Sequence, residues 1–192
     1  MDFRTVYTSD YPQLDTSDLQ RLINACYEEG ETGIVCKPFE RLLLSEVEDM
    51  CNPTLNSKIR MLLLIARSQE GVDVMVGCVK AETDVEQGVG EWGCLAIDKA
   101  YQGKGLGKHL VSALETHMRE SDMHTAQLEL LAPSDGTHMH KERLRGWYER
   151  LGYSLKVPGD KDASSTIIAK GSSLGRFVLA SDAHFTLFQK AL

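Results

Sequence analysis

The stretch that decides the fold is LAIDKAYQGKGLGK, residues 95–108, in which an apolar segment runs into a glycine-dense turn. The apolar residues that follow recur at helical spacing: Leu106, Leu110, Val111, Leu114 and Met118. They predict an amphipathic helix from residue 105 to about residue 121. Glycine permits positive φ and a close backbone approach to a ligand, and the first N–H groups of a helix have no intrahelical partner. The turn therefore predicts an anion site, most simply for a phosphate, at the start of this helix.

Two better-known phosphate motifs compete with this interpretation. Gly103-x-Gly105-x-Gly107 lacks the last glycine spacing of the dinucleotide fingerprint. A nucleotide P-loop needs Ser or Thr after its lysine, and His109 follows Lys108. Taken alone, the motif leaves open a glycine turn with no ligand.

The rest of the chain alternates short apolar runs with two further helical patterns before the turn and one after it. Strands are predicted at residues 2–8, 61–66, 72–79, 91–97, 126–131, 153–157 and 183–190. Helices are predicted at residues 16–27, 38–50 and 141–151, in addition to the one after the turn. Residues 159–175 are polar and predict a long loop. No repeat or linker divides the pattern, which indicates one domain over residues 1–192.

Composition excludes several classes of protein. The formal net charge of −7 disfavours a nucleic-acid partner, which requires a basic face. No apolar run approaches the roughly 20 residues of a membrane span, and residues 1–9 lack the apolar core of a secretory signal, so a cytoplasmic protein is expected. The five cysteines form no metal-ligand pattern and are expected to be free thiols, with Cys78 and Cys94 buried in apolar runs.

Two ordered motifs resemble those of the GNAT superfamily of N-acetyltransferases. QGKGLG, residues 102–107, matches the family signature Gln/Arg-x-x-Gly-x-Gly/Ala and follows an apolar strand, as it does in the family. WYERLGY, residues 147–153, is similar to the family's aromatic-Tyr-x-x-x-Gly-Phe/Tyr segment. The resemblance covers essentially the whole chain, most securely residues 72–153. It implies an α/β (α+β) fold, with a mixed, mostly antiparallel sheet of about seven strands flanked by about four helices.

The resemblance also implies a co-substrate, acetyl-CoA, and the backbone that would hold it. The N–H groups that would bind the pyrophosphate are those of Gln102, Gly103, Lys104, Gly105, Leu106, Gly107 and Lys108. Lys104 and Lys108 would add positive charge. The backbone of Leu95, Ala96 and Ile97 would pair with the pantetheine arm and polarise the thioester carbonyl, so these side chains should tolerate change.

Two side chains are candidates for catalysis by the same resemblance. Tyr148 aligns with the family tyrosine that protonates the departing thiolate, although its spacing from Leu144 equally suits a core residue of the helix. Glu91 stands where many relatives have a general base, although a solvated strand end is an equal interpretation. A dedicated base is unnecessary if the amine arrives neutral.

Histidines precede the last predicted helix. His138 and His140 would lie near the acceptor and the coenzyme arm, so they are candidates for substrate contact. Together with His109 and His124 they form no known ligand pattern, and no metal is expected. A family asparagine that helps bind coenzyme A near this helix has no counterpart here, and Lys141 or His140 occupies that neighbourhood instead.

These observations predict an acetyl-CoA-dependent N-acetyltransferase that acts by direct transfer to an amine in a ternary complex. The alternative is a GNAT-fold module that binds acyl-CoA or regulates a partner without turnover. Acceptor identity is expected to depend on residues 16–50, residues 159–182 and the histidine loop. The amine, a small molecule or a peptide, is not specified by the sequence, and neither is the choice between monomer and homodimer.

Overall fold

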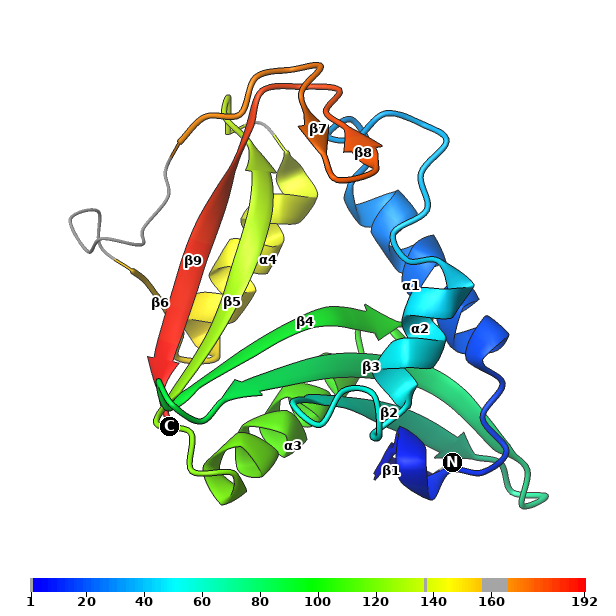
Figure 1. Cartoon of the computed structure of the whole chain (residues 1–192). Coiled ribbons are helices and arrows are strands. Elements are labelled where there is room, and N and C mark those ends of the chain that lie inside the picture. The colour runs from blue at the N-terminus through cyan, green and yellow to red at the C-terminus, as the bar shows by residue number, and fades with distance from the viewer. Residues whose placement is uncertain (1, 137, 157–165) are drawn as a thin grey trace. The chain divides into compact units, whose positions relative to one another are not determined.

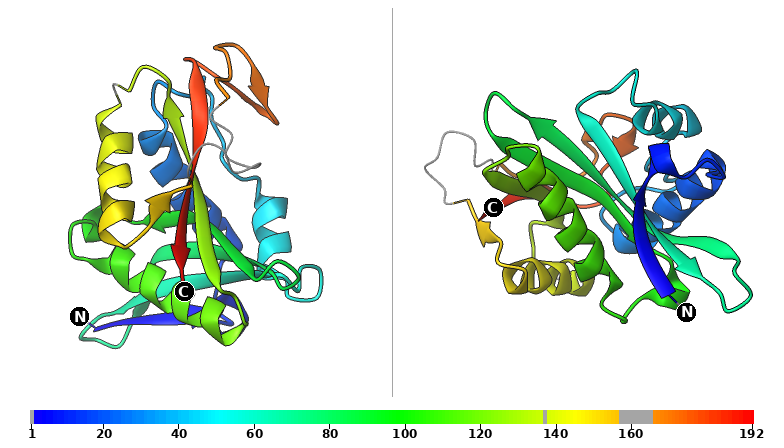
Figure 2. Two further views of the ribbon diagram at one scale, coloured as in Figure 1. Left: turned by 90° about the vertical axis from the view of Figure 1, so that its left-hand side faces the viewer. Right: turned by 90° about the horizontal axis from the view of Figure 1, so that it is seen from below.

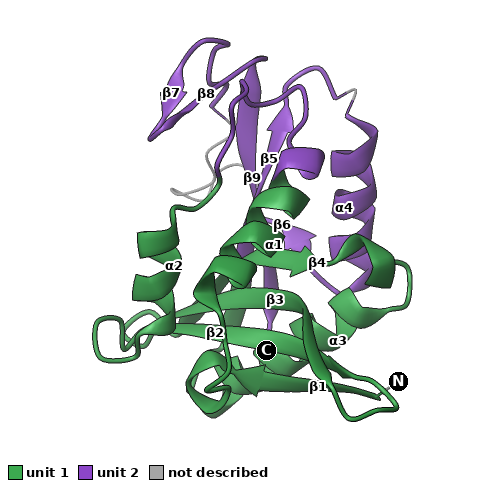
Figure 3. Cartoon of the chain, turned by 90° about the vertical axis from the view of Figure 1, so that its right-hand side faces the viewer, with its two compact units in different colours: residues 1–27, 41–126, 192 green, residues 28–40, 127–191 purple. Residues whose placement is uncertain are grey.

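The structure is a computed structural model that describes residues 2–136, 138–156 and 166–192. The chain forms two compact units, coloured separately in Figure 3. Unit 1 comprises residues 1–27, 41–126 and 192, and unit 2 comprises residues 28–40 and 127–191.

Unit 1 is built on four antiparallel strands with helices on both faces (Figures 1 and 2). The strands are β1 (Asp2–Tyr7), β2 (Ile59–Arg67), β3 (Asp73–Asp84) and β4 (Val89–Ile97). The helix α3 (Leu106–Glu120) covers one face, and α1 (Thr16–Gly30) and α2 (Leu44–Cys51) cover the other. The Asp15 carboxylate accepts the Ser17 N–H at 2.8 Å and caps the first turn of α1.

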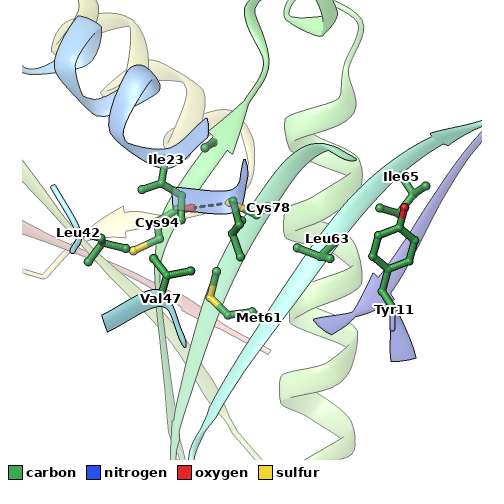
Figure 4. Close-up of a cluster of buried hydrophobic side chains, with 11 residues drawn as sticks. Tyr11, Ile23, Leu42, Val47, Met61, Leu63, Ile65, Cys78 and Cys94 are labelled. Carbon is green, nitrogen blue, oxygen red and sulfur yellow. Dashed lines mark hydrogen bonds between the residues drawn. The ribbon is translucent and has the colours of Figure 1, made fainter. Parts of the chain in front are cut away.

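The core beneath α1 and α2 is drawn in Figure 4. Met61, Leu63 and Ile65 alternate along β2 toward this core, as the period of two in a strand requires. The Cys78 thiol donates to the Cys94 carbonyl at 3.5 Å within it. On the opposite face, Gly90 of β4 lies so close to Met118 of α3 that a Cβ there would approach its sulfur to 2.6 Å.

A β-bulge interrupts β4. Cys78 pairs with Ala96 and Lys80 with Gly93, which leaves Cys94 and Leu95 together opposite the single residue Val79. Cys94 has a φ of 50°, the left-handed conformation that a bulge can impose. The bulge adds one residue to β4, so simple alternation of side chains does not continue across it. A residue before the bulge and a residue after it face the same side of the sheet only when their residue numbers differ by an odd number.

Unit 2 contains the remaining elements of the fold. These are β5 (Thr125–Pro133, whose first two residues belong to unit 1), α4 (Met139–Arg150), β6 (Ser154–Leu155), β7 (Ser173–Leu174), β8 (Phe177–Val178) and β9 (Ala183–Ala191). One apolar cluster gathers Ile34, Val35, Leu131, Leu179 and Ala183. The Tyr148 ring of α4 packs on Phe188 of β9, with ring centroids 5.5 Å apart.

The strand order is β1-β2-β3-β4-β5-β9-β6, with β7 and β8 as a separate pair. The described residues therefore hold a seven-stranded, mostly antiparallel sheet and four α-helices, which confirms the predicted fold class. All seven predicted strands and all four predicted helices are present, and their ends differ by a few residues from the predicted ones. The predicted strand end at Val157 and residues 159–165 of the predicted loop lie outside the described residues.

Two predictions of secondary structure were wrong. The helix predicted at residues 38–50 begins only at Leu44. The reason is that the Asn24 side chain of α1 makes hydrogen bonds to both the N–H and the carbonyl of Leu42. Its Oδ1 accepts the Leu42 N–H at 2.9 Å, and its Nδ2 donates to the Leu42 carbonyl at 3.0 Å. These bonds replace the ones that a helix would make. The polar stretch that ends at Gly175 also contains β7, which pairs with β8 in a short hairpin.

All five cysteines are free thiols. Cys78 and Cys94 are buried, as predicted, Cys26 and Cys51 are half-buried, and Cys36 is exposed. Burial raises the pKa of the Cys51, Cys78 and Cys94 thiols, which keeps these three protonated at neutral pH.

Candidate functional site

The passage from β4 to α3 in unit 1 is fixed by its own side chains. The Asp98 carboxylate accepts the Ala100 N–H at 2.8 Å and starts a single 3-10 turn, Lys99–Tyr101. The Gln102 side chain then reaches back, and its Nε2 donates to the Ile97 carbonyl at 2.9 Å. Gln102, whose backbone N–H was predicted to bind the pyrophosphate, thus also closes the turn through its side-chain amide. Its backbone N–H lies 3.4 Å from the Lys99 carbonyl.

Two glycines shape the turn that follows. Gly103 and Gly105 have φ values of 75° and 78°, a conformation that costs other L-residues about 1–2 kcal/mol. No described atom lies within 4 Å of a Cβ built on either glycine, so the space above the turn is open. The backbone here is exposed because the residues that form it have no side chains.

The first turn of α3 presents N–H groups to that space. Gly105 is the N-cap in the left-handed conformation, and no side chain caps the helix there. His109 makes the first intrahelical bond, to the Gly105 carbonyl at 3.2 Å. The N–H groups of Leu106, Gly107 and Lys108 precede it and therefore have no intrahelical acceptor. With the positive end of the helix dipole, they form an arrangement that suits a phosphate.

The side chains of this segment have other positions. Leu106 is buried in the core, and Lys104 and Lys108 are exposed. The Lys104 ammonium donates to the Ala100 carbonyl at 3.1 Å and lies 5.0 Å from the centre of the Tyr101 ring. The predicted anion site would thus be formed mainly by main chain.

In β4, the three residues predicted to contact the thioester arm have different surroundings. Ala96 is buried in the α1 and α2 core, and Leu95 and Ile97 are half-buried. The Ile97 carbonyl accepts from Gln102 and, at 3.4 Å, from the Cys26 thiol. Leu95 forms the bulge with Cys94, so the regular ladder is interrupted at this point of the predicted thioester site.

Glu91 lies opposite a second carboxylate. In the β3–β4 register it pairs with Glu82, and Lys80, which pairs with Gly93, binds Glu82 with Nζ and Oε2 3.1 Å apart. Directly opposed residues have Cβ atoms about 5 Å apart. Glu91 is half-buried, and no described atom lies within 4 Å of a Cβ built on Gly93 beside it.

The bulge puts this charged group on the face that carries α1 and α2. Cys78, Lys80 and Glu82 share a face by alternation, and their partners Ala96, Gly93 and Glu91 share it with them. Sequence reasoning missed Lys80 and Glu82 because simple alternation along β4 places Glu91 with Ile97, on the other face. The sequence carries no signal for the register itself.

Tyr148, in α4 of unit 2, is 7% exposed. Burial raises the pKa of its phenol well above the ordinary value, so the hydroxyl stays protonated at neutral pH. Its ring contacts Trp147 and Phe188, with centroids 5.4 and 5.5 Å away. The residue is therefore part of the core, as one interpretation of the sequence held, and it also keeps a proton to donate.

The two histidines expected before the last helix lie at its start, His138 as the N-cap of α4 and His140 inside its first turn, and both make contacts inside unit 2. The Nδ1 atom of His138 accepts the Lys141 N–H at 3.3 Å. Lys141 is buried and lies 3.6 Å from Glu31, Nζ to Oε1. His140 lies against Gly30, and burial together with the nearby Lys141 and Arg143 lowers its pKa. No pattern in the sequence indicates that these residues contact residues 30–32.

Within the described ranges, no three His, Cys, Asp or Glu residues are placed to hold a metal ion. The same ranges contain no helix with the length and apolar composition needed to cross a membrane.

Comparison with known proteins adds a family and a set of similar structures. The family profile "Acetyltransferase (GNAT) family" matches residues 17–153. No curated protein matches the chain in sequence.

Solved structures share the fold over nearly the full length of both chains. An acetyltransferase of the GNAT family from Staphylococcus aureus Mu50 is 14% identical, covers 100% of this chain and 99% of its own, and has a TM-score of 0.64. An aminoglycoside 6'-N-acetyltransferase in complex with coenzyme A is 17% identical, with coverage of 100% of this chain and 97% of its own and a TM-score of 0.65. The paia N-acetyltransferase of Thermoplasma acidophilum, also in complex with coenzyme A, is 14% identical, with coverage of 100% of both chains and a TM-score of 0.60. At these identities the likeness establishes the fold alone.

Proposed function

Because the chain belongs to the GNAT acetyltransferase family, we propose that it transfers an acetyl group from acetyl-CoA to a primary amine by direct attack in a ternary complex. The observation that carries the proposal is the turn from β4 to α3. Its two left-handed glycines, its open space and the uncapped start of α3 together suit a pyrophosphate. Two of the similar structures contain coenzyme A, which supports the same co-substrate.

In the proposed reaction, the amine nitrogen attacks the thioester carbonyl carbon. The C–N bond forms, the C–S bond breaks, and the amine loses one proton while the departing sulfur gains one. The backbone of Leu95, Ala96 and Ile97 would orient the thioester, and its bulge supports this assignment because a bulge redirects main-chain groups away from the ladder.

Glu91 is proposed to receive the proton of the amine, directly or through water. It shares its face with Glu82 and Lys80, a group with two carboxylates to one ammonium. Such a group favours a cationic amine electrostatically. A carboxylate that holds an ammonium close to the point of attack can also accept one proton from it before the attack, which frees the nitrogen lone pair.

Tyr148 is proposed to donate a hydrogen bond, and then a proton, to the departing sulfur. Its raised pKa keeps the hydroxyl in the donor form throughout the neutral range. The same shift makes the phenol a weaker acid than a thiol, so the hydrogen bond is expected to contribute more than early proton transfer.

The proposal is tested by titrating acetyl-CoA into the protein by calorimetry. A double variant, Gln102→Glu with Gly105→Glu, places negative charge and bulk at the turn. Gly171→Glu is the control for the glycine substitution, because Gly171 has a φ of 82° and equally open surroundings but is not part of this turn. Binding that is lost in the double variant and kept in the control supports the site. A native protein that does not bind acetyl-CoA contradicts it.

The second candidate, a module that binds acyl-CoA without turnover, is separated by a second measurement. Release of the coenzyme A thiol is followed with a panel of primary amines, including amino acids, polyamines and lysine peptides. Amine-dependent release that Glu91→Gln reduces supports catalysis. Binding without release from any amine supports the module.

A further inference from the structure

The structure determines the tautomer of His138. A backbone carbonyl only accepts hydrogen bonds, so the Nε2 atom 3.0 Å from the Thr32 carbonyl must carry a hydrogen. A backbone N–H only donates, so the Nδ1 atom 3.3 Å from the Lys141 nitrogen must carry none. Both contacts are satisfied together only by a neutral imidazole with its proton on Nε2.

Two neighbouring contacts join the same segments. The Lys141 ammonium and the Glu31 carboxylate lie 3.6 Å apart, and each side chain is 6% exposed. His140 packs on Gly30, where a Cβ would stand 3.2 Å from its Nε2. Gly30, the last residue of α1, and the two residues that follow it, Glu31 and Thr32, thus contact three residues at the start of α4. We call this set of six residues, Gly30, Glu31, Thr32, His138, His140 and Lys141, the α4 clasp.

Protonation of His138 keeps the contact with Thr32 but removes the one with Lys141. It places a hydrogen on Nδ1, which then faces the Lys141 N–H, and the cap of α4 is lost. His140 lies next to His138, and the charged groups that act on His140 are Lys141 and Arg143 from α4 and Glu29 from the end of α1; Glu31 faces Lys141. The imidazole is half-buried, so protons reach it from solvent.

We propose that His138 is a positioning residue: as neutral imidazole it caps the first turn of α4 and joins it to Thr32, and its protonation removes the cap and frees that turn at its N-terminus. The clasp itself does not depend on the proposed function. Its effect on catalysis does, because it acts through α4, the helix that carries Tyr148.

The tautomer is measured directly by long-range proton–nitrogen correlation NMR on ¹⁵N-histidine-labelled protein. At about pH 8, where free imidazoles are neutral, the expected spectrum has His138 with a bare Nδ1 and a protonated Nε2. His138→Ala identifies the resonance. A proton on Nδ1, or an equal mixture of tautomers, would overturn the proposal.

Release of the turn is measured by amide hydrogen exchange in α4, corrected for the intrinsic effect of pH. Between about pH 8 and pH 5.5, exchange at Lys141 and Glu142 is expected to accelerate by about fivefold in the native protein, the factor that corresponds to a lost N-cap. His138→Asn keeps an N-cap acceptor that does not titrate, so its exchange should accelerate less than that of the native protein. His138→Ala should exchange fast at both pH values.

The same exchange in native protein at both pH values, or an equal pH effect in native protein and His138→Asn, contradicts the clasp. The catalytic link is tested separately, with an amine that supports turnover. Native kcat should fall in acid more than that of His138→Asn, with the KM for acetyl-CoA alike in both. Equal kcat profiles would reject the link to Tyr148. Because hydrogen exchange needs no substrate, it decides on the clasp even if the proposed acetyl transfer fails.

Discussion

The helices α3 and α4 begin in opposite ways. At α3, the N-cap is a left-handed glycine, no side chain caps the helix, and the space above the turn is open. At α4, the N-cap is His138, whose ring accepts the Lys141 N–H. The Lys141 ammonium, in the first turn of α4, forms a buried ion pair with Glu31. One helix start leaves its N–H groups available to a ligand, and the other is closed by contacts within the protein.

The difference separates a helix start that suits a ligand from one that is closed by contacts within the protein. Both have the helix dipole, and both follow a strand and a polar turn, so neither feature discriminates. The discriminating feature is the N-cap. Histidines at α4 attract attention in the sequence because histidine is common in active sites, yet in the structure the contacts of this start are with the end of α1.

The largest effect is expected at the closed start. Lys141→Met leaves the buried Glu31 carboxylate without its ammonium partner, and the free energy of unfolding should fall by about 3–5 kcal/mol. Glu31→Gln with Lys141→Met removes both charges and should recover most of that loss. Urea denaturation of the two variants measures this. A double variant no more stable than Lys141→Met would show that the pair itself is not what closes α4.

The next prediction contrasts a side chain of α4 with the backbone of α3. Tyr148→Phe keeps the packing on Phe188 but removes the proposed donor, so kcat should fall about 100-fold, a lower bound for loss of a general acid. Tyr153→Phe, at another buried tyrosine of unit 2, is the control and should leave kcat unchanged. Because burial raises the pKa of Tyr148, native kcat should show no loss from its ionisation below about pH 10.

A smaller effect is expected at the open start. Gly105→Ala fits the space but not the left-handed backbone, so the free energy of unfolding should fall by about 1–2 kcal/mol. Gly171→Ala has the same strain elsewhere and should be destabilised equally. Calorimetry should then find weaker acetyl-CoA binding in Gly105→Ala alone. Equal affinities for both variants would argue against a role of this backbone in binding.

The smallest effect concerns pH. Burial and nearby cations lower the pKa of His140 in the folded protein, so the unfolded chain takes up its proton first as the pH falls. Stability is therefore unaffected at alkaline pH and declines from about pH 6.5, the ordinary histidine value, downward through the folded pKa. His140→Gln, made in a His138→Asn background to remove the neighbouring imidazole, should reduce this decline in thermal unfolding. An unchanged decline would contradict the assignment.

Much of the fold was predictable because its signals are local. The turn at residues 102–107 and the apolar period after it identify β4 and α3, and the structure contains both. The start of α2 was not predictable, because the bonds between Asn24 and Leu42 join residues far apart in the sequence. The hairpin of β7 and β8 was missed because strands of two residues have no period to detect.

The candidate site likewise contains residues that a local sequence pattern identifies and residues that only long-range contacts bring together. Gly103 and Gly105 were identified from composition and spacing, and their positive φ values fit that interpretation. The group around Glu91 was not, since its membership depends on the bulge at Cys94 and on the β3–β4 register. The contacts of His138 and Lys141 with residues 31 and 32 span more than a hundred positions, and no local pattern predicts such contacts.

The graded exposure of the five thiols also has a practical consequence. Cys36 is the single fully exposed cysteine, and the thiols of Cys51, Cys78 and Cys94 are protected both by burial and by raised pKa values. A maleimide dye applied briefly near neutral pH should therefore attach first at Cys36. The native sequence thus supplies a fluorescent reporter position in unit 2, four residues from Thr32, without any cysteine having to be added or removed.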